Sequence, residues 1–196
     1  QEDQKRALEF LNEASTRDFD ISLIPPLIPS LSSSVDPAFV KELSVILRSE
    51  ECQPFARQAA GLQLKNVLYA KEEERRAQYL NRWLSLPADI RTQVKVLVVQ
   101  TLGTEPFRPS IAAQCVAAIA CAELPSGEAL RLYFMHAFLA CPCSFTASHW
   151  PDVIDALRTS VTNPASTASL KESSLETLGY ICQDIDATVC YQITSA

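Results

Sequence analysis

Apolar residues recur along most of the chain with the three-to-four-residue spacing of an amphipathic helix. Three segments add small residues to this spacing: residues 55–68, 111–124 and 170–184. In the first of them, Ala59, Ala60 and Gly61 stand where one helix presses on a neighbour. Four larger residues are expected to fill the rest of its apolar stripe, namely Leu62, Leu64, Val67 and Leu68.

Other segments with helical spacing lie between or before these copies. Asp36 is suited to cap a helix and Pro37 to begin it, and Gly103 is suited to end one. One amphipathic helix that recurs with another helix between its copies indicates an all-α fold, an α-solenoid. Solenoids bind partners along a long concave face and seldom catalyse reactions. The additional helices are expected at residues 4–14, 37–47, 71–85, 88–102 and 150–161, and the third small-residue helix should close at Gln183.

Two blocks do not fit this pattern. Residues 21–36 contain three prolines and a run of serines, which exclude a regular helix, yet the block is rich in Leu and Ile. Residues 126–148 include a stretch that is apolar almost all round, and they disturb the spacing between neighbouring helices. We interpret both blocks as insertions in a repeat array.

Composition limits the functional classes. The 196 residues are 47% hydrophobic and 20% charged, which is enough apolar material for a buried core. A net charge of -6 argues against nonspecific nucleic-acid binding, which needs a basic face. It suits a basic partner. No segment is long and apolar enough to cross a membrane, and no signal peptide is visible. The chain begins with Gln, so we expect its N-terminus to be incomplete.

The cysteines give no support for catalysis or metal binding. There are seven, an odd number, and Cys115, Cys121 and Cys182 fall on apolar helix faces, which indicates a reducing compartment without disulfides. Cys141 and Cys143 have metal-like spacing but lack a second ligand pair. No catalytic motif is present. We therefore expect no enzyme activity, no catalytic residue, no cofactor and no metal.

Two lysines stand out from the packing residues around them. Lys65 lies on the first small-residue helix and Lys71 just beyond it. Sequence physics alone leaves open whether they bind a partner or only keep the surface soluble. The neighbouring charge run over residues 72–76 is interpreted as a solvated helix face with local ion pairs.

Most of the chain, outside the two blocks and the last ten residues, resembles a known protein family. Many ordered motifs resemble the N-terminal HEAT repeats of the importin-β (karyopherin-β) family. These motifs are Ala59-Ala-Gly-Leu-Gln-Leu-Lys-Asn66, Gln78-Tyr-Leu-Asn-Arg-Trp-Leu84, Gln100-Thr-Leu-Gly-Thr104, Arg108-Pro-Ser110, Gln114-Cys-Val-Ala117, Ile119-Ala-Cys-Ala-Glu123, Trp150-Pro151, Val161-Thr-Asn-Pro164, Lys171-Glu-Ser173 and Gly179-Tyr-Ile-Cys-Gln-Asp-Ile-Asp186.

The resemblance implies a segment of a right-handed HEAT-repeat superhelix, about three and a half repeats long. It divides the chain into an importin-β N-terminal domain over residues 1–124, an insertion over 125–148, a further HEAT repeat over 149–186 and a divergent tail over 187–196. The first helix of the family would precede Gln1. The blocks at 21–36 and 125–148 would then be retained introns or gene-model errors.

The resemblance also implies that the chain is a fragment of a nuclear import receptor. It implies that this fragment binds the Ran GTPase in its GTP form on the inner face, which the B helices of the repeats form. It places Lys65 and Lys71 at that contact, with Asn66, Arg108 and Gln114 as further candidates. The family's sites for nucleoporins and importin-α would lie beyond this chain. The implied location is the cytoplasm and nucleus, with no nucleic-acid or membrane partner. A helical-repeat scaffold with another protein partner, or a non-functional truncated product, is the alternative.

Overall fold

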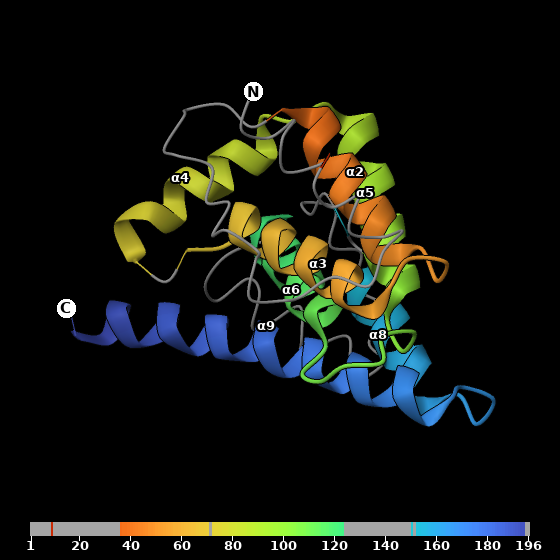
Figure 1. The fold of residues 1–196 in the computed structure, drawn as a ribbon. Helices are drawn as coiled ribbons and strands as arrows, with labels where there is room; N and C mark the ends of the chain where they lie inside the picture. Colours follow the sequence, from red (N-terminus) through yellow and green to blue (C-terminus); the bar gives the residue numbers. More distant parts are fainter. Residues whose placement is uncertain (1–8, 10–35, 71, 124–149, 151, 195–196) are drawn as a thin grey trace.

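The computed structural model describes residues 9, 36–70, 72–123, 150 and 152–194, and this part of the chain contains helices and no strand. Figure 1 shows how these helices stack. Their bounds are α2 (Pro37–Arg48), α3 (Pro54–Leu68), α4 (Glu73–Leu84), α5 (Ala88–Thr101), α6 (Ile111–Glu123), α8 (Val153–Thr162) and α9 (Ala168–Thr194).

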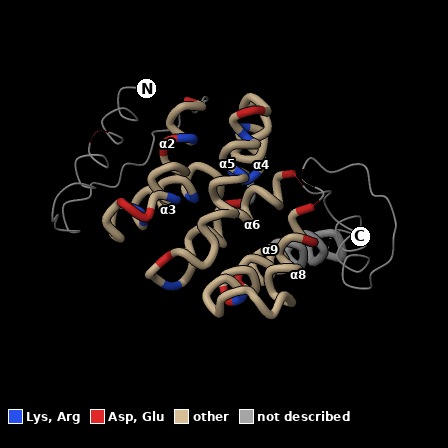
Figure 2. The backbone as a smooth tube through the Cα atoms, turned by 90° about the vertical axis from the view of Figure 1, so that its right-hand side faces the viewer, with Lys and Arg blue, Asp and Glu red and all other residues tan. Residues whose placement is uncertain are grey.

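The helices form three pairs, which are arranged in two layers. α2 packs on α3, α5 on α6, and α8 on α9, while α4 is an extra helix that contacts α3 and α6. α2 also contacts α5, and α6 lies between α3 and α9. We call α3, α6 and α9 the B layer. Figure 2 shows the pairs following one another from the left to the lower right. The predicted all-α HEAT-repeat solenoid is confirmed.

Helix α2 begins as its sequence predicts. The Oδ1 atom of Asp36 accepts a hydrogen bond from the Ala38 amide at 2.9 Å, and Pro37 occupies the first turn. This satisfies one of the amide groups that a helix start leaves without a partner. The predicted helix stop is also present: Gly103 has φ +79°, which favours glycine, and its Cα faces the backbone of Leu170.

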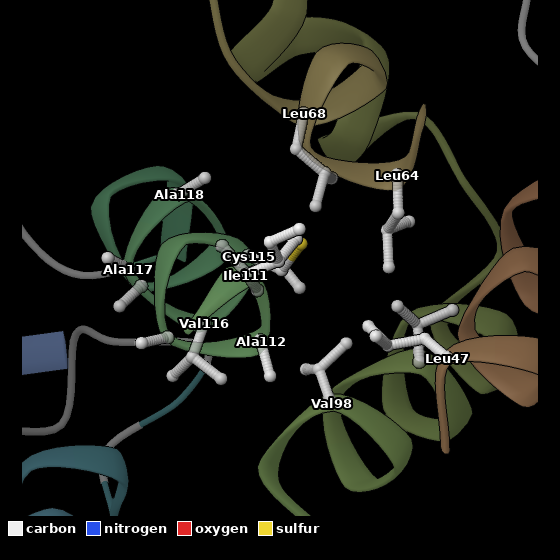
Figure 3. Close-up of a cluster of buried hydrophobic side chains, with 14 of the residues drawn as sticks. Leu47, Leu64, Leu68, Val98, Ile111, Ala112, Cys115, Val116, Ala117 and Ala118 are labelled. Carbon is white, nitrogen blue, oxygen red and sulfur yellow. The ribbon is translucent and has the colours of Figure 1, made fainter. Parts of the chain in front are cut away.

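Small residues bring α3 close to its neighbours. A Cβ atom at Gly61 would lie 2.8 Å from Cγ2 of Ile111 and 3.0 Å from Cδ1 of Leu47, so glycine permits the close contact of α3 with α6 and α2. In Figure 3, Leu68 of α3 points toward Cys115 and Ile111 of α6, and Leu64 points into the space between α6 and Leu47 of α2. The predicted packing role of the small residues is therefore confirmed.

Two predicted core positions are wrong. Leu62 is 44% exposed, because it points away from the face of α3 that holds Leu64. Cys182 is also exposed, whereas Cys115 is buried and Cys121 is half-buried. The spacing of apolar residues predicts burial least well for residues at the edge of the apolar stripe of a helix.

The end of the chain also differs from the prediction. α9 continues to Thr194 instead of closing at Gln183, so most of the predicted divergent tail is helical. Of the helix expected over residues 4–14, only Glu9 is described, and it is helical. Residues 21–35 and 125–149, with Cys141 and Cys143, lie outside the described residues, as does Lys71. No described helix is long and apolar enough to cross a membrane.

A buried arginine joins the first two helix pairs. Arg57 on α3 is 4% exposed and donates from Nε to the Leu47 carbonyl at 2.9 Å. Its Nη1 and Nη2 donate to the carbonyl and hydroxyl of Thr104 at 3.2 and 2.8 Å. The side chain thus ties the end of α2 to the loop between α5 and α6. Its pKa is lowered mainly by burial, an effect that nearby Glu105 opposes.

Candidate functional site

A pocket of about 230 Å³ opens between the three helices of the B layer. Each helix contributes residues at helical spacing, because positions three and four apart share one face. α3 and the residue after it contribute two residues four positions apart. α6 contributes three residues at spacings of three and four, and α9 contributes two residues three positions apart. The lining residues are Lys65, Tyr69, Gln114, Ala117, Ala118, Tyr180 and Gln183.

The pocket has an apolar part and a polar part. Ala117 and Ala118 are buried and short, so they leave the space that longer side chains would fill. Lys65 is half-buried and is the one charged residue among the seven that line the pocket. The remaining polar groups are amides and phenols. This combination can hold the side chain of a partner but offers no acid–base pair for catalysis.

The phenol of Tyr180 stays protonated at neutral pH. Burial raises its pKa, with a further rise from the negative charge of Glu176, while a hydrogen bond with Gln114 lowers it in part. A protonated hydroxyl can donate a hydrogen bond to a bound group. Gln114 and Tyr180 therefore connect α6 to α9 across the pocket.

Tyr69 is held at the other side of the pocket by an arginine. Nη2 of Arg76 donates to the Tyr69 hydroxyl at 3.0 Å, and the guanidinium lies 5.3 Å from the centre of the Tyr69 ring. Tyr69 immediately follows α3, where its amide donates to the Lys65 carbonyl at 2.9 Å. These contacts fix the position of the ring next to Lys65.

The structure brings together two of the predicted site residues. Lys65 and Gln114 both line the pocket, although 49 positions of sequence separate them. Asn66 is exposed on α3 and does not line the pocket. Lys71 lies outside the described residues.

Arg108 occupies a different place, in the loop that precedes α6. Its Nε and Nη2 both lie 3.1 Å from Oε2 of Glu172 on α9, and Nη1 donates to the Glu105 carbonyl at 3.2 Å. The amide of Ser110 donates to Glu176 on α9 at 2.9 Å. Arg108 therefore links the loop to the third helix pair.

Glu105 holds the start of α6, the central helix of the pocket. Its Oε1 accepts from the amides of Ile111 and Ala112 at 3.2 and 3.1 Å, and its Oε2 accepts from the Ser110 hydroxyl. A carboxylate at a helix start satisfies amides that have no partner within the helix. Burial raises the pKa of Glu105, an effect that these hydrogen bonds oppose.

Cys115 on α6 does not line the pocket and is not suited to react. It is fully buried, and its Sγ lies 3.6 Å from the Gly61 carbonyl. Burial raises the pKa of its thiol far above the ordinary value, so little thiolate forms at neutral pH. Among the described residues, no cluster of His, Cys, Asp and Glu could hold a metal ion.

Sequence reasoning did not assign Tyr69, Tyr180 or Gln183 to the site. Their spacing could have suggested it, since Tyr69 follows Lys65 by four positions and Gln183 follows Tyr180 by three. Nothing in one sequence shows, however, that the faces of three separate helices converge. That convergence depends on the packing of α6 between α3 and α9.

Comparison with known proteins gives consistent results. Residues 30–104 match the sequence pattern of the importin-beta N-terminal domain. The chain is 37% identical over 144 residues to importin subunit beta-1 of Schizosaccharomyces pombe, which covers 73% of this chain and 14% of that protein. It is 30% identical over 155 residues to importin subunit beta-1 of Arabidopsis thaliana, which covers 79% of this chain and 15% of that protein.

The fold agrees with these sequence matches. A crystal structure of importin beta in an ammonium sulfate condition superimposes with a TM-score of 0.58 at 26% identity, covering 91% of this chain and 16% of that one. The chain thus spans 14–15% of the length of the two curated relatives named above. With a matching domain, two matching relatives and the same helical-repeat fold, the chain belongs to the importin-β family.

Proposed function

We propose that the chain is a fragment of a nuclear import receptor that binds the Ran GTPase in its GTP form. The observation that carries this proposal is the match of residues 30–104 to the importin-beta N-terminal domain. The pocket supports it, since Lys65 stands there with polar neighbours on the face formed by the B layer. The proposed role is binding without catalysis, in a protein that moves between cytoplasm and nucleus.

Lys65 is the central residue of the proposed contact. Its ammonium group is a compact charge on a flexible stem, which suits pairing with a carboxylate or a backbone carbonyl. Asn66 and Gln114 are proposed to contribute hydrogen bonds beside it, and Lys71 a second charge. Arg108 is proposed to act at the edge of the contact, because its guanidinium already contacts Glu172.

The proposed domain division follows from the same family. Residues 1–124 would form the importin-β N-terminal domain, and residues 149–186 a further HEAT repeat. The nucleoporin and importin-α sites of the full-length family are proposed to lie outside this chain, so neither partner is expected to bind it.

The test compares affinity for Ran·GTP and Ran·GDP by calorimetry. We expect tighter binding of the GTP form. Equal affinity for the two nucleotide states, or no binding, would overturn the proposal and favour a scaffold with another partner.

A set of variants locates the contact. Lys65→Ala should weaken Ran·GTP binding by about thirtyfold or more, because removing one member of a desolvated charge pair typically costs about 2 kcal/mol or more. Lys71→Ala should also weaken it. Lys41→Ala is the matched control, because it removes the same charge from α2 in the other layer. The thermal midpoints of the three variants should match that of the parent.

Ala59→Asp separates loss of fold from loss of contact. Ala59 is 8% exposed within α3, so a carboxylate there enters a close helix–helix contact. This variant should lose binding together with its thermal transition. If Lys65→Ala binds Ran·GTP as tightly as Lys41→Ala, Lys65 is not part of the contact.

A further inference from the structure

The pocket between α3, α6 and α9 has room for a group from another molecule. Its volume of about 230 Å³ corresponds to several water molecules, each of which takes about 30 Å³ in the liquid. One side chain from another protein would fit into this space. Which kind of side chain binds there depends on the charged, polar and apolar groups that line the pocket.

The polar wall favours a negatively charged group. Lys65 supplies the one charge of the lining, and Gln114, Gln183 and the protonated Tyr180 hydroxyl can each donate a hydrogen bond. Glu176 carries a negative charge that acts on Tyr180, but it does not line the pocket, and its Oε2 accepts the Ser110 amide at 2.9 Å at the start of α6. Lysine and hydrogen-bond donors together match a carboxylate.

The apolar wall favours a carboxylate on an aliphatic stem. Ala117 and Ala118 present methyl groups to the pocket, and the Tyr69 ring is held in place by Arg76. Methylene groups can pack on this surface while the carboxylate reaches Lys65. A basic side chain would meet the ammonium of Lys65 without any acid among the lining residues.

We propose that the pocket receives an acidic side chain of the partner protein, a Glu or Asp whose carboxylate pairs with Lys65 and accepts hydrogen bonds from Gln114 and Tyr180. This inference deepens the proposed function, on which it rests for the identity of the partner. It adds Tyr180 to the contact, and it gives Gln114 and Tyr180 together the role of selecting the sign of the occupant's charge.

A pair of substitutions at one position tests the sign of the charge. Gln114→Glu places a carboxylate beside the occupant, and Gln114→Lys places an ammonium there. Like charges in contact are strongly unfavourable at an interface. We expect Gln114→Glu to weaken Ran·GTP binding at least about tenfold and Gln114→Lys to keep or improve it. The opposite order would show a basic occupant, and equal affinities would show that the pocket is not used.

A second measurement does not depend on Ran. The isotopically labelled chain is titrated with a Glu-rich decapeptide and, as control, with the same peptide carrying Gln, while NMR follows the side-chain amides of Gln114 and Gln183. We expect saturable shifts with the Glu peptide that disappear in Lys65→Ala and are absent with the Gln peptide. Shifts of equal size with both peptides, or none, would overturn the inference.

The two measurements separate the two proposals. Peptide-dependent shifts without affinity for Ran·GTP would refute the proposed partner and support the acidic occupant. Binding of Ran·GTP that ignores the charge at position 114, with no peptide shifts, would support the partner and refute the acidic occupant. Tyr180→Phe adds a check, since removing only the hydroxyl should weaken a carboxylate contact by severalfold, while the thermal midpoint should fall only by the small cost of the lost hydrogen bond with Gln114.

Discussion

Glu123 at the end of α6 provides a direct test of how the helices are held together. Its carboxylate is fully buried and accepts from the Trp83 indole on α4 at 2.9 Å. On α5, Arg91 and Lys95 approach its two oxygens at 3.0 and 2.7 Å. One carboxylate therefore joins three helices, and Glu123→Gln removes its charge while keeping an acceptor for the indole.

The expected cost follows from the two cations that the substitution leaves behind. Removing one member of a buried ion pair costs about 3–5 kcal/mol, because the remaining charge is not compensated. The side chains of Arg91 and Lys95 are 15% and 12% exposed, so water relieves part of this cost. We therefore expect a loss of about 2–4 kcal/mol in the free energy of unfolding.

Urea denaturation followed by circular dichroism measures this loss. With a slope of about 2 kcal/mol per molar urea, the midpoint should fall by about 1–2 M. Asp155→Asn is the control, because Asp155 forms an exposed pair with Arg158 at 3.2 Å and should contribute less than about 1 kcal/mol. Adding Lys95→Gln to Glu123→Gln should recover part of the loss. A midpoint for Glu123→Gln within about 0.2 M of the Asp155→Asn midpoint, a tenth to a fifth of the expected shift, would refute the reasoning.

Three further predictions concern packing, capping and thiol chemistry. In urea denaturation, Gly61→Ala should lower the free energy of unfolding by about 1–3 kcal/mol, because the added Cβ would lie 2.8 Å from Cγ2 of Ile111. Gly179→Ala should be neutral or stabilising, because an added Cβ there would have no atom within 4 Å. Equal effects of the two substitutions would contradict the packing argument. Asp36→Ala should cost about 1 kcal/mol through loss of the hydrogen bond to Ala38, and Asp36→Asn much less; identical midpoints would show that the cap contributes nothing. Peptide-resolved mass spectrometry after brief iodoacetamide treatment at pH 8 should find Cys182 alkylated and Cys115 protected until urea is added, and rapid alkylation of Cys115 in the folded chain would contradict its burial.

Local signals in the sequence predicted the helices and several of their ends, although the predicted end of α9 was wrong. Asp36 followed by Pro37 predicts a helix start, and the Asp36 hydrogen bond confirms it. Gly61 among alanines predicts a close helix contact, which its distance to Ile111 confirms. Each of these signals depends on a few adjacent residues, so tertiary packing had little opportunity to override it.

Long-range features were not predictable in the same way. In the sequence, Leu62 fits the apolar stripe of α3 as well as Leu64 does. The neighbouring helices cover Leu64 and leave Leu62 exposed, and their positions cannot be read from the spacing. The buried charges of Arg57 and Glu123 look like ordinary surface charges in the sequence, because their partners lie up to 47 positions away. Lys65 was identified by family resemblance, and its pocket only by the structure.

The central position of α6 has a consequence for binding. Repeats in a solenoid contact only their neighbours, so the distance between Lys65 on α3 and Tyr180 on α9 is set by how α6 packs against each of them. The contact of Gly61 with Ile111 fixes the first of these packings, and the hydrogen bond from Ser110 to Glu176 contributes to the second. Because both Ile111 and Ser110 lie at the start of α6, a small shift there would move the two walls of the pocket relative to each other. The shape of the pocket therefore depends on residues that do not line it.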